Sequence, residues 1–314
     1  MTYFLRFLFL LPLLVLMSGC RKEADADPGV VPGQNRYTVE VDGDQREYYV
    51  HVPSAFDAGN SVPLVIMLHG SGGDGLKFYN TCGWKEVGEA ENILTAFPSA
   101  WEYCVEEEGK TKKTSKWNAV GSFAFCAGER PRDDVKFLRS LIEDLGKMVN
   151  LDKRRIYIAG FSNGAAMSSK CLFEMQDVFA AICANAGFQL EGTKDDISIH
   201  VPLQVQTGSH DDNVVAANGN QPLPVNITEA LNTAVMKPII ESFIKELDLE
   251  ETYTTSGNVN SATFATFKGK SGLSQHVFVF SIIKAATHQY PNGDNHPFMA
   301  AKQQWEWMRQ FVKP

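Results

Sequence analysis

The most constraining feature of this chain is the pentapeptide Gly-Phe-Ser-Asn-Gly at residues 160–164. It follows segment 155–159, which has the pattern of a buried strand, and precedes the helix-like stretch 165–174. A serine between two glycines at a strand-to-helix junction is typical of a nucleophile elbow, because larger side chains at the glycine positions would clash in so sharp a turn. A simple glycine-rich turn is the alternative. The flanking strand and helix favour the elbow, so we predict that Ser162 is an exposed nucleophile.

Strand-like and helix-like segments alternate along the rest of the chain. The turn-forming pair Asp42-Gly43 lies between two β-rich segments and indicates a hairpin. Asp133 and Asp134 begin an amphipathic helix and are interpreted as helix-capping residues. Apolar runs predict buried strands at 62–68, 93–97, 155–159, 180–186, 203–207 and 277–283, and a last helix is predicted over 297–312. This alternation predicts an α/β protein with a mostly parallel central sheet flanked by helices, in one domain over residues 36–314.

The N-terminal residues have a different character. Arg6 precedes an apolar run that is too short to span a bilayer comfortably, and the run ends in Met17-Ser18-Gly19-Cys20. These four residues resemble the bacterial lipobox, in which cleavage precedes a lipid-bearing cysteine, although Met17 replaces the usual leucine. We expect a lipoprotein signal peptide at 1–19, a lipid on Cys20 and a flexible tether over 20–35, with an ordinary cleaved signal peptide as the alternative. The protein is then expected in the bacterial cell envelope, anchored to a membrane on its periplasmic or cell-surface face.

Export would place the cysteines beyond Cys20 in a compartment where disulfides persist. Cys104 and Cys126 flank the charged run 106–113, which is interpreted as a solvated loop, and a bridge between them would order it. Cys183 lies in an apolar stretch and is expected to be buried. The pairing among Cys82, Cys104, Cys126, Cys171 and Cys183 stays open, because connectivity cannot be deduced from sequence.

Charge and spacing exclude several kinds of partner. The formal net charge is −8, which provides no electrostatic attraction for nucleic acid. The histidines and cysteines do not have the spacing of a metal site. The glycine-rich segment 69–73 lacks both the lysine of a P-loop and a dinucleotide fingerprint. We therefore expect no nucleic acid, metal or organic cofactor. The sequence leaves the oligomeric state undetermined.

A serine hydroxyl requires an imidazole to accept its proton and a carboxylate to orient that imidazole. Around a nucleophile elbow the chain order is serine, acid, histidine. Asp211 follows the predicted strand 203–207 and is the predicted acid, with Asp212 as the alternative. His288 follows the last predicted strand and is the predicted base, with His296 as the alternative.

An acyl-transfer site also needs two preorganised donors for the oxyanion. The backbone amide of Asn163, next to the nucleophile, is the first predicted donor. The amide of Ser71, in the glycine-rich loop after strand 62–68, is the second. His69 in the same loop is interpreted as a structural residue.

Taken together, these segments resemble an esterase family that includes polyhydroxybutyrate depolymerases, feruloyl esterases and acetylxylan esterases, within the α/β-hydrolase superfamily. The segment His288-Gln289-Tyr290-Pro291 is similar to the family's histidine motif, with Tyr290 replacing a usual tryptophan. The resemblance also rests on residues 63–70, 117–118, 133–137, 160–168, 179–182 and 208–211. It implies an α/β-hydrolase fold, a serine esterase activity, and a triad of Ser162, Asp211 and His288.

Resemblance and expected location together imply an ester of a plant polysaccharide, feruloyl or acetyl, as the substrate. Polyhydroxybutyrate is the alternative. Trp101, Trp117 and Tyr290 are candidate substrate contacts, although packing is the usual role of a single aromatic residue. Residues 212–235 are expected to form a wall or lid over the pocket. A non-catalytic glycan-binding module and a peptidase on the same fold remain as further alternatives.

Overall fold

The computed structural model describes residues 29–107, 109–119, 124–190 and 192–313. The predicted signal peptide, the predicted lipidation site Cys20 and most of the predicted tether lie outside these residues. Within the described ranges, no helix has both the length and the apolar composition that crossing a membrane requires.

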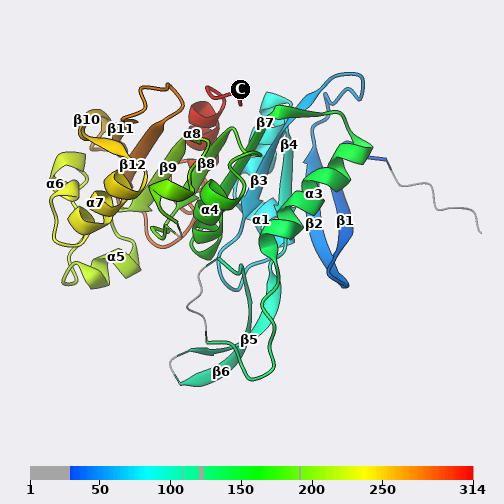
Figure 1. Cartoon of the computed structure of the whole chain (residues 1–314), viewed down its shortest axis with the longest axis horizontal. Coiled ribbons are helices and arrows are strands. Elements are labelled where there is room, and N and C mark those ends of the chain that lie inside the picture. The colour runs from blue at the N-terminus through cyan, green and yellow to red at the C-terminus, as the bar shows by residue number, and fades with distance from the viewer. Residues whose placement is uncertain (1–28, 108, 120–123, 191, 314) are drawn as a thin grey trace, which may run out of the picture.

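A ten-stranded sheet runs through the molecule in the order β1-β2-β4-β3-β7-β8-β9-β12-β11-β10 (Figure 1). The strands are β1 (Gly33–Val41), β2 (Asp44–Val52), β3 (Val62–Leu68), β4 (Leu94–Pro98), β7 (Leu151–Phe161), β8 (Ala181–Asn185), β9 (Leu203–Gly208), β10 (Leu249–Asn258), β11 (Ala262–Gly269) and β12 (Val277–Ile283). From β4 to β12 neighbouring strands run parallel, whereas both edges are antiparallel. The parallel centre aligns the carboxyl ends of its strands along one edge of the sheet.

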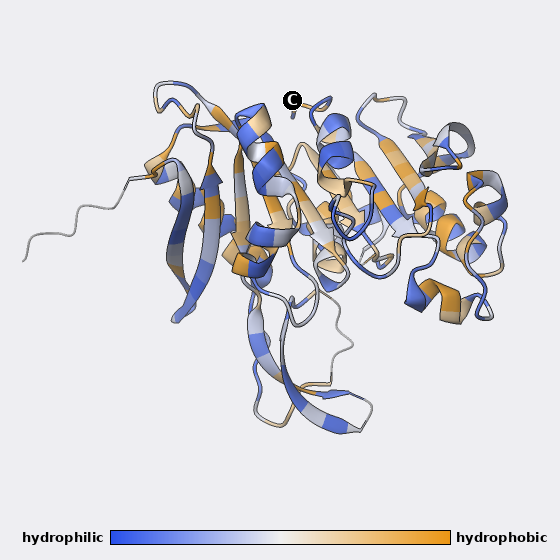
Figure 2. Ribbon diagram, turned by 180° about the vertical axis from the view of Figure 1, so that it is seen from behind, coloured by the Kyte–Doolittle hydropathy of each residue, from blue (hydrophilic) through white to orange (hydrophobic). Residues whose placement is uncertain are grey.

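Helices cover both faces of the parallel centre, and every residue of β3, β8 and β9 is buried. One face packs against α3 (Asp134–Met148), α4 (Asn163–Glu174), α6 (Ile227–Leu231) and α7 (Met236–Glu246). The other packs against α1 (Gly75–Thr81), α2 (Trp84–Glu91) and α8 (Ala300–Met308). In Figure 2 the central strands are largely hydrophobic, and the helices carry both hydrophobic and hydrophilic residues. The α/β architecture predicted from the sequence is confirmed, because strands buried on both faces are what continuous apolar runs produce.

Two strands at one end of the sheet, β11 and the edge strand β10, were not predicted from the sequence. In β10 most side chains are exposed, so the strand lacks the apolar run that marks the central strands. In β11 buried and less buried positions alternate over much of the strand, as expected when only one face is well covered. Both extend the sheet beyond β12 through antiparallel pairing.

Residues 106–107 and 110–113 of the charged run lie in two paired strands, which corrects the interpretation of the run as a loop. Strands β5 (Trp101–Glu107) and β6 (Lys110–Lys116) pair antiparallel and project from the main sheet (Figure 1). Cross-strand ion pairs join Lys112 and Lys116 to Glu107. A disulfide links Cys104 in β5 to Cys126 beyond the hairpin. The cysteines Cys82, Cys171 and Cys183 are buried and not disulfide-bonded.

Candidate active site

The elbow forms at the junction of β7 and α4, where its glycines are required by close packing. Ser162 has φ 53° and ψ −117°, in the positive-φ region that non-glycine residues seldom adopt. A Cβ atom at Gly160 would lie 2.1 Å from the carbonyl oxygen of Gly164, and one at Gly164 would lie 2.5 Å from that of Leu68. No side chain fits at either position. The packing therefore holds Ser162 in a strained backbone conformation of the kind that clusters at functional sites.

The structure brings the predicted serine, histidine and aspartate together. His288 Nε2 lies 2.9 Å from Ser162 Oγ, and His288 Nδ1 lies 2.8 Å from Asp211 Oδ2. With Nδ1 donating to the buried carboxylate, Nε2 is free to accept the serine proton. The three residues follow β7, β9 and β12, whose carboxyl ends share one edge of the sheet.

Neither alternative residue occupies this position. Asp212 is exposed in the first turn of α5 (Asp212–Ala217), whereas Asp211 is 1% exposed and caps that helix. His296 Nε2 instead lies 2.8 Å from the carbonyl oxygen of Lys284.

Asn213 is a neighbour of the histidine that the sequence did not single out. Its side-chain Nδ2 lies 3.2 Å from His288 Nδ1, and its backbone amide donates to Asp211 Oδ1. Because Nδ1 already donates to the carboxylate, the opposite amide orientation would offer Oδ1 as a second acceptor for the ring. One indication of this role was available from the sequence, because Asn213 lies in segment 212–235, which was predicted to form a wall of the pocket.

A pocket of ≈310 Å³ opens beside the serine. Its lining includes Ser71, Asn163, Phe188, Asn213 and His288. The amide of Asn163 is the first in α4, so it has no intrahelical acceptor and lies at the positive end of the helix dipole. Both predicted oxyanion residues therefore border the same cavity as the nucleophile. Within the described part of the chain, no group of three or more His, Cys, Asp or Glu side chains could hold a metal ion.

A buried hydrogen-bond network holds the loop that carries Ser71. His69 Nδ1 donates to the carbonyl oxygen of Gly70 at 2.7 Å, and His69 Nε2 accepts from the amide of Ala100 at 3.0 Å. Trp117 Nε1 donates to the carbonyl oxygen of His69 at 2.8 Å. The side chain of Asn163 bonds to both the amide and the carbonyl of Trp117, at 2.7 and 3.1 Å. The network thus connects the residue after the nucleophile to the loop of the second oxyanion donor.

The side chain of Asn163 is expected to be a positioning element for this network. Asn163→Ala keeps the backbone amide but leaves the backbone polar groups of Trp117 unpaired. We expect kcat on para-nitrophenyl acetate to fall about 10- to 100-fold with little change in KM, because small displacements near the reacting atoms are costly. Stability should fall by about 1–3 kcal/mol, measured by urea unfolding. A variant that loses stability but retains full kcat would contradict the positioning role.

Burial of His69 should make the protein less stable in mild acid. Desolvation lowers the pKa of His69 from 6.5 to about 4. His69 is therefore protonated below about pH 6.5 in the unfolded chain but only near pH 4 in the folded chain. Stability present above pH 6.5 is lost as pH falls through this window, by up to about 3 kcal/mol. Urea unfolding at successive pH values measures the loss, and His69→Gln should show a shallower slope between pH 6.5 and 5. Equal slopes would refute this assignment.

The three predicted aromatic substrate contacts require correction. Trp117 is 0% exposed, so its ring serves the loop network and cannot reach a ligand. Tyr290 is 6% exposed, with its hydroxyl bonded to Trp84 Nε1 and Gln304 Oε1. Trp101 is half-buried under the guanidinium of Arg132, 4.4 Å from the ring centroid. None of these three residues lines the pocket at Ser162.

Comparisons with known proteins show which families this chain resembles. A sequence profile described as phospholipase/carboxylesterase matches residues 57–215. The poly(3-hydroxyalkanoate) depolymerase C of Paucimonas lemoignei is 25% identical over 141 residues, which are 45% of this chain and 31% of that protein. Feruloyl esterase B of Piromyces equi is 28% identical over 179 residues, 55% of this chain and 30% of that protein. The chain therefore spans about a third of the length of these relatives.

A solved structure extends the likeness over most of the fold. The acetyl xylan esterase from Aspergillus awamori superposes with a TM-score of 0.52 at 15% sequence identity. The match covers 88% of this chain and 99% of that one. At this level of identity the likeness concerns the fold.

Proposed function

Because the chain belongs to the phospholipase/carboxylesterase family, we propose that it is an exported carboxylic-ester hydrolase with Ser162 as its nucleophile. The observation that carries the proposal is the continuous hydrogen-bonded series from Ser162 through His288 to the buried Asp211. This series borders a pocket, so the serine hydroxyl can meet a substrate. The series also argues against a purely glycan-binding module, since glycan binding does not require a hydrogen-bonded serine, histidine and aspartate.

In the proposed mechanism, Ser162 Oγ attacks the ester carbonyl carbon while His288 Nε2 accepts the hydroxyl proton. Asp211 keeps the imidazole oriented and stabilises the imidazolium that forms. The backbone amides of Asn163 and Ser71 hold the negative oxygen of the tetrahedral intermediate. As that intermediate collapses, His288 returns the proton to the departing alkoxide, which leaves as the alcohol. An acyl ester on Ser162 remains.

Water then repeats the sequence on the acyl-enzyme. His288 removes a proton from the water as it attacks the acyl carbonyl carbon, and the same amides hold the second oxyanion. The proton passes to Ser162 Oγ as the carboxylic acid departs. Apart from the ester and water, the cycle uses only groups that the chain itself supplies.

The proposed substrate is a feruloyl or acetyl ester of a plant polysaccharide. The likeness to feruloyl esterase B supports this class, and the ≈310 Å³ pocket suits a small acyl group. A polyhydroxyalkanoate is the second candidate, supported by the likeness to a depolymerase of that polymer. A peptidase has no comparable support.

Three substrates would separate these candidates. Release of acid from methyl ferulate, acetylated xylan and a hydroxybutyrate oligomer should favour one of the first two by at least about tenfold in kcat/KM. Preference for the oligomer would replace the polysaccharide proposal and leave the esterase proposal standing. Inactivity on all three substrates and on para-nitrophenyl acetate would refute both the polysaccharide proposal and the esterase proposal.

Export and anchoring are proposed from the N-terminal sequence. The disulfide between Cys104 and Cys126 supports them, because such bonds persist mainly in oxidising compartments. Cell fractionation after labelling with radioactive palmitate should find the processed chain, which begins at Cys20, labelled in the membrane fraction. Cys20→Ala should abolish both the label and the membrane location. A soluble, unlabelled wild-type protein would contradict the anchor.

A further inference from the structure

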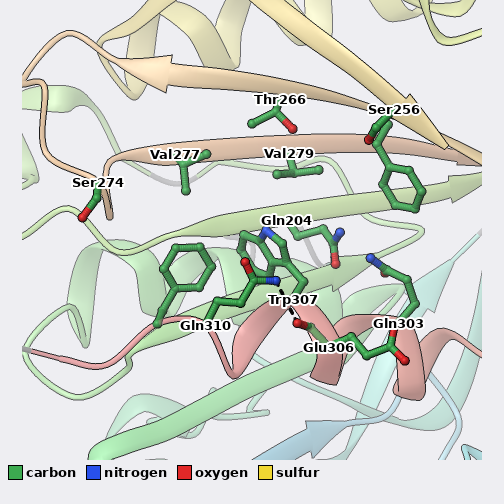
Figure 3. A pocket seen from close by; sticks show the side chains of 12 residues that line it. Gln204, Ser256, Thr266, Ser274, Val277, Val279, Gln303, Glu306, Trp307 and Gln310 are labelled. Atoms are coloured by element: carbon green, nitrogen blue, oxygen red, sulfur yellow. Dashed lines mark hydrogen bonds between the residues drawn. The ribbon is translucent and has the colours of Figure 1, made fainter.

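A second pocket, here called the α8 groove, lies between α8 and the sheet and shares no lining residue with the pocket at Ser162. Its volume is ≈480 Å³, within the usual range for ligand sites. Gln204 of β9 and Val277 and Val279 of β12 contribute to the sheet side (Figure 3). The predicted mechanism uses none of these residues.

One face of the C-terminal helix and the turn after it forms a wall of the groove. The spacing of the wall residues places them on the same side of the helix over two turns, a length of about 10 Å. These residues are Gln303, Glu306, Trp307 and Gln310. The opposite side of α8 packs into the core through residues such as Trp305 and Met308. The groove therefore runs along a helix face that the rest of the fold leaves open.

Aromatic and hydroxyl groups complete the lining. Trp307 and Phe311 are half-buried and pack edge to face, with ring centroids 4.9 Å apart. The strand side also includes Phe264 and Thr266 of β11 and Ser256 of β10. The groove thus places aromatic surfaces on both sides of its polar groups.

A buried amide on the sheet side, that of Gln204, has unused hydrogen-bonding capacity. Gln204 is fully buried, and its Nε2 has no partner among the described residues. Gln303 Oε1 accepts from Gln206 Nε2 at 2.6 Å, which orients the Gln303 side chain. A buried donor without an acceptor is costly, so a polar ligand that accepts from it would gain free energy.

We propose that the α8 groove binds a segment of a neutral polysaccharide chain. The C–H faces of sugar rings pack on aromatic side chains. Sugar hydroxyls donate to and accept from amides and hydroxyls, and they donate to a carboxylate. Among the described lining residues there is no Lys or Arg, and Glu306 would repel a polyanion. A purely apolar ligand would leave Gln204 Nε2 unpaired. Because the groove is separate from the catalytic pocket, such binding would hold the enzyme on a polymer while the pocket at Ser162 acts on ester groups at other positions of that polymer.

Binding is measured with the full-length Ser162→Ala protein, so that catalysis plays no part. Affinity gel electrophoresis in arabinoxylan, galactomannan and mixed-linkage β-glucan should show retardation by at least one polymer. Trp307→Ala and Phe264→Ala, on opposite sides of the groove, should each weaken that binding by about tenfold. Trp101→Ala is the matched control, a half-buried tryptophan outside the groove, and should retain it. Circular dichroism checks the fold, and Gln303→Ala replaces any variant that fails to fold.

Three outcomes would overturn the proposal. The first is no retardation by any of the polymers, and the second is equal retardation of the parent and both groove variants. The third is a dimer in sedimentation analysis that Trp307→Ala converts to a monomer, which would make the groove a contact between copies. Because the assay does not depend on hydrolysis, failure of the esterase proposal would leave its result unchanged.

Discussion

Ser162→Ala is expected to lower kcat on para-nitrophenyl acetate by about 10⁴- to 10⁶-fold, with KM changed far less. The substitution removes the oxygen that lies 2.9 Å from His288 Nε2 and leaves the pocket otherwise intact. Residual activity above the uncatalysed rate is expected, because the backbone amides of Asn163 and Ser71 remain in place. Initial rates on purified protein provide the measurement.

A chemical probe gives an independent readout of the same residue. An organofluorophosphonate should add once per wild-type chain, at Ser162, and mass spectrometry should find no adduct on the alanine variant. Ser61→Ala is the matched control, since Ser61 is an exposed serine outside the pocket, and it should behave as wild type. A Ser162→Ala protein within about tenfold of wild-type kcat would remove the serine mechanism.

Asp134→Ala is expected to destabilise the fold by about 3–5 kcal/mol, the largest stability effect predicted for this chain. Asp134 Oδ1 accepts from Arg46 Nη2 at 2.6 Å, and the two side chains are 0% and 2% exposed. Asp134 Oδ2 accepts from the backbone amide of Asn118 at 2.7 Å. Removing the carboxylate would leave a guanidinium charge buried without its partner, and that unpaired charge causes most of the loss.

Two variants separate this effect from simple helix capping. The adjacent Asp133 is the N-cap of α3, and Asp133→Ala should cost only about 1 kcal/mol. The double variant Arg46→Met, Asp134→Leu removes both charges together and should recover most of the stability lost in Asp134→Ala. Urea unfolding at neutral pH measures all three. Equal losses of stability for Asp133→Ala and Asp134→Ala would show that breaking the buried ion pair costs no more than removing a helix cap.

The local sequence determined the central strands and the elbow. Continuous apolar runs predicted β3 and β12 with the bounds observed, since burial on both faces removes any need for polar positions. The glycines of residues 160–164 predicted the sharp turn because that requirement is steric and local. The approximate positions of Asp211 and His288 followed from strand order, because parallel strands bring their carboxyl ends to one edge.

Tertiary structure alone decided which side chains are buried and what they meet. Trp117 and Tyr290 lie close in sequence to site residues, yet packing encloses both, and Asp134 pairs with an arginine far away in the chain. The β5–β6 hairpin is stabilised by cross-strand pairing that the charged run did not indicate. The disulfide between Cys104 and Cys126 is one of the candidate pairings, and the structure confirms it. The approach of Asn213 to His288, and the α8 groove, likewise exist only once distant elements pack. Periodicity and motifs report how a segment faces its surroundings, whereas contacts between remote residues depend on how the helices and strands assemble in three dimensions.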